Sequence, residues 1–131
     1  MPILLVFLLS LVDFGIALDR REVIQHAVRE GARSASVGLS EAEITGVVVA
    51  QSQGVLEEPD VAVCYAVGPG GDPAGSVGSA VRVSATFTYA FSLGSGELLN
   101  AMGVDPNALS IEMTPSAESR LEIAVPGATA C

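Results

Sequence analysis

The sequence has no tryptophan and no lysine, it has one histidine, and aromatic residues make up only 5% of the chain. It therefore offers little aromatic surface on which bases or sugars could stack. All six basic residues are arginines, and four of them lie between Arg20 and Arg33. The formal net charge of −9 repels a phosphate backbone, so we expect no nucleic-acid partner.

Charged residues of either sign are also scarce, at 16% of the chain, whereas half of the residues are hydrophobic. Soluble domains usually contain about a quarter charged residues. A length of 131 residues suffices for one domain and leaves no room for a second sizeable core. We therefore expect one small domain with a membrane segment.

Motifs that carry catalysis are missing as well. There is no G-x-S-x-G turn, and the segment Gly68–Gly71 lacks the spacing and the lysine of a phosphate-binding loop. Because His26 is the only histidine, a zinc site would need both cysteines plus carboxylates. We expect His26 on the solvated side of a helix, and we expect a protein that is not an enzyme and needs no metal or cofactor.

An apolar run opens the chain. It extends from Pro2 to Val12 and, after Asp13, resumes as far as Leu18, which is just below the roughly 20 residues that span a bilayer as a helix. Three interpretations compete, namely a membrane anchor that begins upstream of this chain, a cleavable signal peptide and a buried core helix. No basic residue precedes the run, and it continues into a helix, which argues against a signal peptide. We favour a transmembrane anchor over residues 1–18.

The apolar run continues as one long helix, because Gly15 and Gly31 are the only residues between Ile3 and Ser34 that could break it, each at a cost of about 1 kcal/mol relative to alanine. Its second half is amphipathic, with small and aliphatic residues at helical spacing on one face. Ala27, Gly31 and Ala32 are small enough to let another backbone approach closely. Either the C-terminal domain of the same chain or a partner helix would pack there.

The rest of the chain predicts a second helix and several strands. Ser40 and Glu43 have the spacing of a capping box for a helix that ends near Gly54. A glycine-rich loop is expected at residues 68–78 and a short helix at 97–102. Alternating apolar residues predict strands at residues 61–65, 81–89, 109–113 and 121–125. The fold class is therefore α+β, in which a long N-terminal helix, transmembrane and then amphipathic, packs on a small antiparallel β-sheet.

Two segments of the first third resemble a known family. The run from Pro2 leads into Asp13-Phe14-Gly15, and further on stands Ala27-Val28-Arg29-Glu30-Gly31-Ala32-Arg33. They are similar to the membrane segment and the Arg-Glu-Gly-Ala-Arg motif of TadE/TadG-like pseudopilins, the minor pilins of tight-adherence (Flp) pilus assembly. Here Val28 is inserted after the leading alanine of that motif. The remainder of the chain resembles the family only in its layout.

The resemblance implies a minor pilin or pseudopilin, which is a structural or assembly component of a bacterial Flp/Tad-type pilus. It implies a single-pass protein of the inner membrane, processed upstream of Pro2, with residues 19–131 as a pilin-like extracytoplasmic domain. The implied partners are the lipid bilayer, other pilin or pseudopilin subunits and the pilus assembly machinery. The candidates for helix packing and assembly are Asp13, Gly15, Ala27, Arg29, Gly31, Ala32 and Arg33. An alternative function is a small periplasmic binding module, exported or membrane-anchored, that is unrelated to pili.

Asp13 is unusual because an acidic side chain is costly inside a membrane segment. Either it lies near the interface, where it reaches water, or it meets an arginine or a helix N-terminus of a neighbouring subunit. Arg20 and Arg21 would by themselves favour an inside location for the flank that they occupy, which is opposite to the orientation that the resemblance implies.

The two cysteines predict a covalent link. Their even number and the oxidising compartment implied above favour a disulfide between Cys64 and Cys131. Such a bridge would tie the C-terminal tail to a strand. Two alternatives remain, namely a buried free Cys64 with a disordered Cys131, and an intermolecular bridge through Cys131.

Overall fold

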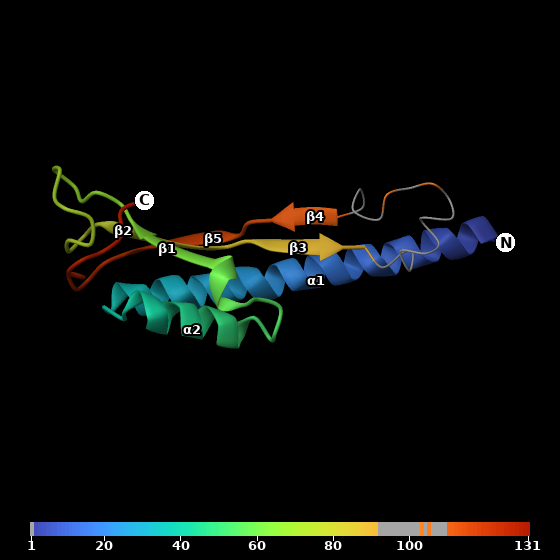
Figure 1. The fold of residues 1–131 in the computed structure, drawn as a ribbon, viewed down its shortest axis with the longest axis horizontal. Coiled ribbons are helices and arrows are strands. Elements are labelled where there is room, and N and C mark those ends of the chain that lie inside the picture. Colours follow the sequence, from blue (N-terminus) through green and yellow to red (C-terminus); the bar gives the residue numbers. More distant parts are fainter. Residues whose placement is uncertain (1, 92–102, 104, 106–109) are drawn as a thin grey trace.

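The computed structural model describes residues 2–91, 103, 105 and 110–131, and of Pro2, Ile3 and Val6 it describes only the backbone (Figure 1). Within these residues a long helix and a small antiparallel sheet form the predicted α+β fold. The elements are α1 (Pro2–Ser36), α2 (Glu41–Gln51), the 3-10 helix η1 (Glu58–Asp60), β1 (Val61–Tyr65), β2 (Ala80–Ala85), β3 (Phe87–Ala90), β4 (Ser110–Met113) and β5 (Ser116–Arg120).

Helix α1 forms the long axis of the molecule (Figure 1). Its 35 residues correspond to about 52 Å at 1.5 Å per residue. No proline interrupts it after its first residue, so the backbone hydrogen bonds continue to its end. Its C-terminal half packs against α2, β2 and β5, whereas its N-terminal end extends beyond these elements.

Helix α2 begins with the predicted capping box. The Ser40 hydroxyl accepts a hydrogen bond from the Glu43 amide, and the Glu43 carboxylate accepts one from the Ser40 amide at 2.9 Å. Both contacts satisfy amide groups that have no partner within the helix. Ile44 and Val48, one turn apart, are the buried side chains of α2.

Two antiparallel sheets lie on the helices. The larger sheet has the order β1-β2-β5, with Val63 opposite Val83 and Val83 opposite Ala117. Strands β3 and β4 form a separate two-stranded sheet, which we call the β3–β4 ribbon, with Tyr89 opposite Ile111. The ribbon extends from the larger sheet toward the N-terminal end of α1 (Figure 1).

The hydrophobic core fills the space between the helices and the larger sheet. Its side chains come from every third or fourth residue of α1 and from alternate residues of β2, as the two periodicities require. The core residues are Ile24, Ala27, Val28, Ala32, Ala35, Ile44, Val48, Leu56, Tyr65, Val81, Val83, Ala85 and Leu121.

The strand predicted over residues 81–89 is wrong in its continuity. The chain leaves the larger sheet at Thr86, whose amide donates to the Asp60 carbonyl at 2.9 Å. Strand β2 ends at Ala85, and β3 pairs with a different partner, β4. The alternation of apolar residues continues across Thr86 because β2 and β3 each have one face that packs against the rest of the protein and one face in water.

The strand predicted over residues 121–125 is also misplaced. The strand at the edge of the sheet is β5, whose sequence Ser-Ala-Glu-Ser-Arg is polar, and it pairs with β2 along its full length. Leu121 is buried, but Ile123 is 55% exposed. The other predicted strands coincide with β1 and, from residue 110 onward, with β4. The short helix expected at residues 97–102 lies outside the described residues.

Candidate assembly surface on the N-terminal helix

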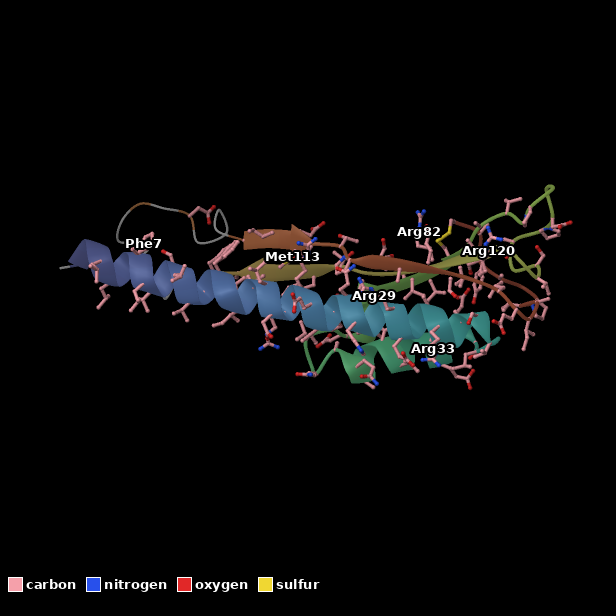
Figure 2. The ribbon with its side chains drawn as sticks, turned by 180° about the vertical axis from the view of Figure 1, so that it is seen from behind. Phe7, Arg29, Arg33, Arg82, Met113 and Arg120 are labelled. Carbon is pink, nitrogen blue, oxygen red and sulfur yellow. A yellow bond between two sulfur atoms is a disulfide. The ribbon has the colours of Figure 1, made fainter. Side chains whose placement is uncertain are left out.

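The N-terminal half of α1 carries a large apolar surface. Ten of its large apolar side chains are between 43% and 70% exposed, and they surround the helix because successive residues are about 100° apart. Figure 2 shows the end of the helix that carries them, where Phe7 is labelled. We call this surface the apolar tip, and it consists of Leu4, Leu5, Phe7, Leu8, Leu9, Leu11, Val12, Phe14, Ile16 and Leu18.

Among the residues that the structure describes, no helix has both the length and the apolarity needed to cross a membrane. The anchor over residues 1–18 therefore stays a prediction.

Asp13 interrupts the apolar tip and is buried. Its side chain is 4% exposed, and its Oδ1 accepts a hydrogen bond of 3.0 Å from the Tyr89 hydroxyl of β3. Its Oδ2 is buried and has no hydrogen-bond partner among the described residues. Burial and, after it, the contact with the Asp13 carboxylate raise the pKa of the Tyr89 hydroxyl. Asp13 is thus not open to water, and its partner is a tyrosine of the same chain, which sequence reasoning did not identify.

Tyr89 reaches Asp13 from a row of aromatic rings. The Tyr89 ring lies edge-on to Phe91, with centroids 5.3 Å apart, and 6.2 Å from Phe87. Phe87, Tyr89 and Phe91 alternate along the chain, so the pleat of β3 places them on one face. One turn after Asp13, Ala17 is also buried. The ribbon therefore covers α1 as far as Asp13.

A groove separates α1 from β4. Its volume is about 410 Å³, and Met113, labelled in Figure 2, lies on the ribbon side. Most of the lining is apolar, and Arg21 and Glu112 add two charged groups to it. The lining residues are Phe14, Ala17, Leu18, Arg21, Ile111, Glu112, Met113, Thr114 and Pro115.

The small-residue face of α1 packs against the chain's own domain. Ala27 and Ala32 are buried in the core. A methyl group at Gly31 would collide with Cγ2 of Val48 and would lie 3.4 Å from Cγ1 of Val83. Glycine at this position thus allows α1, α2 and β2 to approach one another closely. Of the two predicted alternatives, this is packing against the chain's own C-terminal domain.

The other assembly candidates lie on the surface. Gly15 has open space around it, since a methyl group there would meet nothing within 4 Å. Arg29 and Arg33 are exposed on α1 (Figure 2), and Arg33 stands in the last turn, where a positive charge favours the helix dipole. His26 is also exposed, as predicted. The described residues contain no cluster of three or more potential metal ligands.

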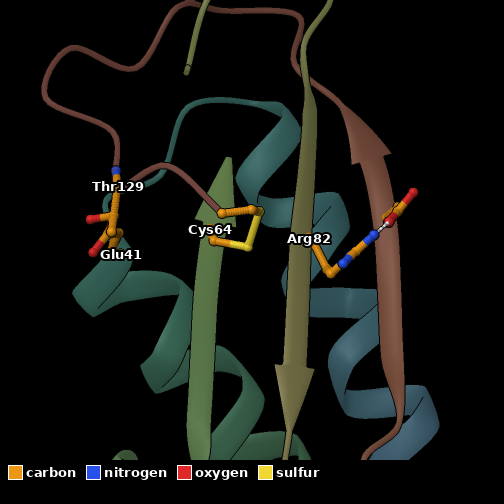
Figure 3. The surroundings of a disulfide bond; sticks show 6 residues. Glu41, Cys64, Arg82 and Thr129 are labelled. Carbon is orange, nitrogen blue, oxygen red and sulfur yellow. Dashed lines mark hydrogen bonds and ion pairs between the residues drawn. A yellow bond between two sulfur atoms is a disulfide. The ribbon is translucent and has the colours of Figure 1, made fainter. Parts of the chain in front are cut away.

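The disulfide predicted between Cys64 and Cys131 is present, and it attaches the C-terminal tail to β1 (Figure 3). The tail also pairs with β1 through its backbone. The Tyr65 amide donates to the Thr129 carbonyl at 2.9 Å, and the Cys131 amide donates to the Tyr65 carbonyl at 3.1 Å. The tail therefore continues the sheet beyond β1, on the side opposite to β5.

Part of the chain matches a known protein family. The family described as TadE-like protein matches residues 1–33, which include the apolar tip, Asp13 and the small-residue face as far as Arg33. No curated protein and no solved structure matches the chain. TadE-like proteins belong to Tad pilus systems, so the match implies a component associated with such a pilus. Over these 33 residues, the N-terminal helix of the chain is similar to that of TadE-like proteins.

Proposed function

We propose that this chain is a minor pilin or pseudopilin, a structural or assembly component of a bacterial Flp/Tad-type pilus. Helix α1 ties it to the inner membrane through residues 1–18, and residues 19–131 form a pilin-like domain on the extracytoplasmic side. Its partners are the lipid bilayer, other pilin or pseudopilin subunits and the pilus assembly machinery. The observation that carries the proposal is the family match on a helix whose apolar tip is exposed.

The apolar tip supports a membrane location because its side chains surround the helix. A helix that packs on one partner is apolar along one stripe, whereas a helix that is apolar all round requires burial on every side. Full burial of a large apolar side chain contributes about 1.5–3 kcal/mol, so ten roughly half-exposed ones contribute on the order of 10 kcal/mol. This is as large as the stability of a typical small domain.

The disulfide supports an extracytoplasmic location for the domain. Bridges such as Cys64–Cys131 persist in oxidising compartments and are rare in the cytoplasm, where thiols are kept reduced. The tail that it fastens has no other covalent restraint.

A binding module unrelated to pili receives less support. Ligand pockets combine apolar walls with a few converging polar groups. The groove between α1 and β4 has such a lining, with Arg21 and Glu112 among apolar side chains, but the family match of the chain is to TadE-like proteins. We assign the chain no catalytic activity, because the TadE-like family has a structural role in pili.

Deletion and complementation in the host bacterium test the proposal. We expect the deletion strain to lose pili in electron micrographs and the intact gene to restore them. Phe7→Asp, in the apolar tip, should release the protein from the membrane fraction and fail to restore pili. Val67→Asp is the matched control, since Val67 is 65% exposed in a loop of the domain, and it should restore them.

Protease added to spheroplasts provides the second measurement. It should digest the domain of the intact protein without lysis of the cells. Normal piliation in the deletion strain, or recovery of the intact protein in the soluble cytoplasmic fraction, would refute the proposed function.

A further inference from the structure

The surroundings of α1 change abruptly at Asp13. From Leu4 to Val12, the large side chains that the structure describes are exposed, and they point to all sides of the helix. At Asp13 the β3–β4 ribbon reaches α1, and from there on one face of the helix is covered. Large exposed apolar side chains therefore point to all sides of the helix only on the N-terminal side of Asp13.

The groups that meet at Asp13 are unsuited to hydrocarbon. The carboxyl group has one buried oxygen without a hydrogen-bond partner among the described residues, and a lipid tail offers no hydrogen-bond donor to it. Two turns further along α1, on the same helix face, stands Arg20, and Arg21 follows it. Charged side chains of this kind avoid the bilayer centre and reach toward the headgroups.

The ribbon itself imposes a second limit. Because it has only two strands, each of β3 and β4 has one edge without a neighbouring strand in the described part of the chain. Open sheet edges are not tolerated in the hydrocarbon region, since their amide and carbonyl groups find no partners there. Wherever the ribbon lies against α1, that part of the helix must remain outside the hydrocarbon.

We propose that the Asp13–Tyr89 hydrogen bond and the ribbon limit how far α1 inserts into the membrane, a role that we call the depth stop. The hydrocarbon begins on the N-terminal side of Asp13, and Ile16 and Leu18 lie at the level of the lipid headgroups. The membrane-embedded part of the helix thus ends about one and a half turns before Leu18. This inference rests on the proposed membrane location of α1 and adds the boundary at which the lipid ends.

Single tryptophans can locate the boundary, because the chain contains none of its own. Leu8→Trp and Ile16→Trp replace exposed apolar residues on either side of Asp13, about 12 Å apart along the helix. Each full-length variant is reconstituted, with its disulfide intact, in vesicles of phosphatidylethanolamine and phosphatidylglycerol that carry bromine on the acyl chains. We expect the bromine to quench Leu8→Trp severalfold more strongly than Ile16→Trp, which should remain accessible to acrylamide from the water.

Equal quenching of the two variants would show that α1 inserts past Asp13, and it would overturn the depth stop without touching the membrane location. Failure of both variants to float with the vesicles would instead overturn the proposed membrane location, and the depth stop with it.

A second comparison tests the role of the hydrogen bond. In the Ile16→Trp background, Tyr89→Phe removes the hydroxyl that binds Asp13 and should raise the quenching severalfold. Thr88→Val is the matched control, because it removes a hydroxyl from the exposed, opposite face of β3 and should leave the quenching unchanged. Unchanged quenching in Tyr89→Phe would contradict the assignment of the stop to this contact.

Discussion

Replacing Gly31 by alanine, with Gly15→Ala as a matched control, tests the packing of α1 on α2. Both glycines lie in the interior of the same helix. In an exposed helix interior, alanine is about 1 kcal/mol more favourable than glycine, since glycine loses more backbone freedom. At Gly15 the new methyl group would meet nothing within 4 Å. Gly15→Ala should therefore raise the free energy of unfolding by up to about 1 kcal/mol.

At Gly31 the same methyl group would enter occupied space. It would collide with Cγ2 of Val48, which is fully buried and, as a β-branched side chain, cannot easily rotate away. Overpacking of this kind costs about 1–3 kcal/mol, and the helical gain of about 1 kcal/mol offsets part of it. We expect Gly31→Ala to lower the free energy of unfolding by up to about 2 kcal/mol, which is opposite in sign to Gly15→Ala. Gly31→Leu should prevent the domain from packing.

Urea unfolding followed by circular dichroism, with the disulfide intact, measures both effects. The clash can be isolated in a Val48→Ala background, where the obstructing methyl groups are gone. There Gly31→Ala should become neutral or stabilising, which gives a coupling energy in the double-mutant cycle. Stabilisation by Gly31→Ala in the intact protein, equal to that by Gly15→Ala, would refute the close approach and favour a partner helix at this face.

Three further changes have expected outcomes. Replacing both Cys64 and Cys131 by serine opens a link across 67 positions, so urea unfolding should show a loss of about 4 kcal/mol, and an unchanged midpoint would contradict the estimate. Ser40→Ala should cost about 1 kcal/mol at neutral pH. The hydrogen bonds from the Ser40 hydroxyl and amide hold the pKa of the Glu43 carboxyl below its ordinary 4.5, so the contribution of these two bonds is present above pH 4.5 and should vanish as the pH falls further, whereas the bond from the Glu43 amide to the Ser40 hydroxyl does not titrate. Tyr89→Phe leaves both oxygens of a buried carboxyl group unpaired and should cost about 1–3 kcal/mol. Because the pKa of Tyr89 is raised above 10, the intact protein should also lose stability above pH 10, and the variant should lose less.

Local signals in the sequence determined the helices and the covalent link. The apolar spacing between Ile24 and Ala35 recurs every third or fourth residue, which is the period of a helix with one buried face. The capping box at Ser40 depends on residues three positions apart, so it needs no distant partner. Two cysteines in one small domain allow a single intramolecular pairing, between Cys64 and Cys131.

Only the tertiary structure decided where strands begin, end and pair. The alternation of apolar residues runs through Thr86 unbroken, yet the pairing partner changes there from β5 to β4, and the local pattern does not specify that change. Strand β5 has almost no alternation of apolar residues. Its position in the sheet is set by its pairing with the edge of β2.

The surroundings of single residues in α1 likewise depend on segments that are far away in the sequence. Gly15 and Gly31 are equivalent glycines in one helix, but the first faces open space and the second faces Val48 of another helix. Asp13 is paired with Tyr89, 76 positions away in sequence. A local pattern fixes which face of a helix is apolar, whereas the identity of what covers that face depends on contacts between segments far apart in the chain.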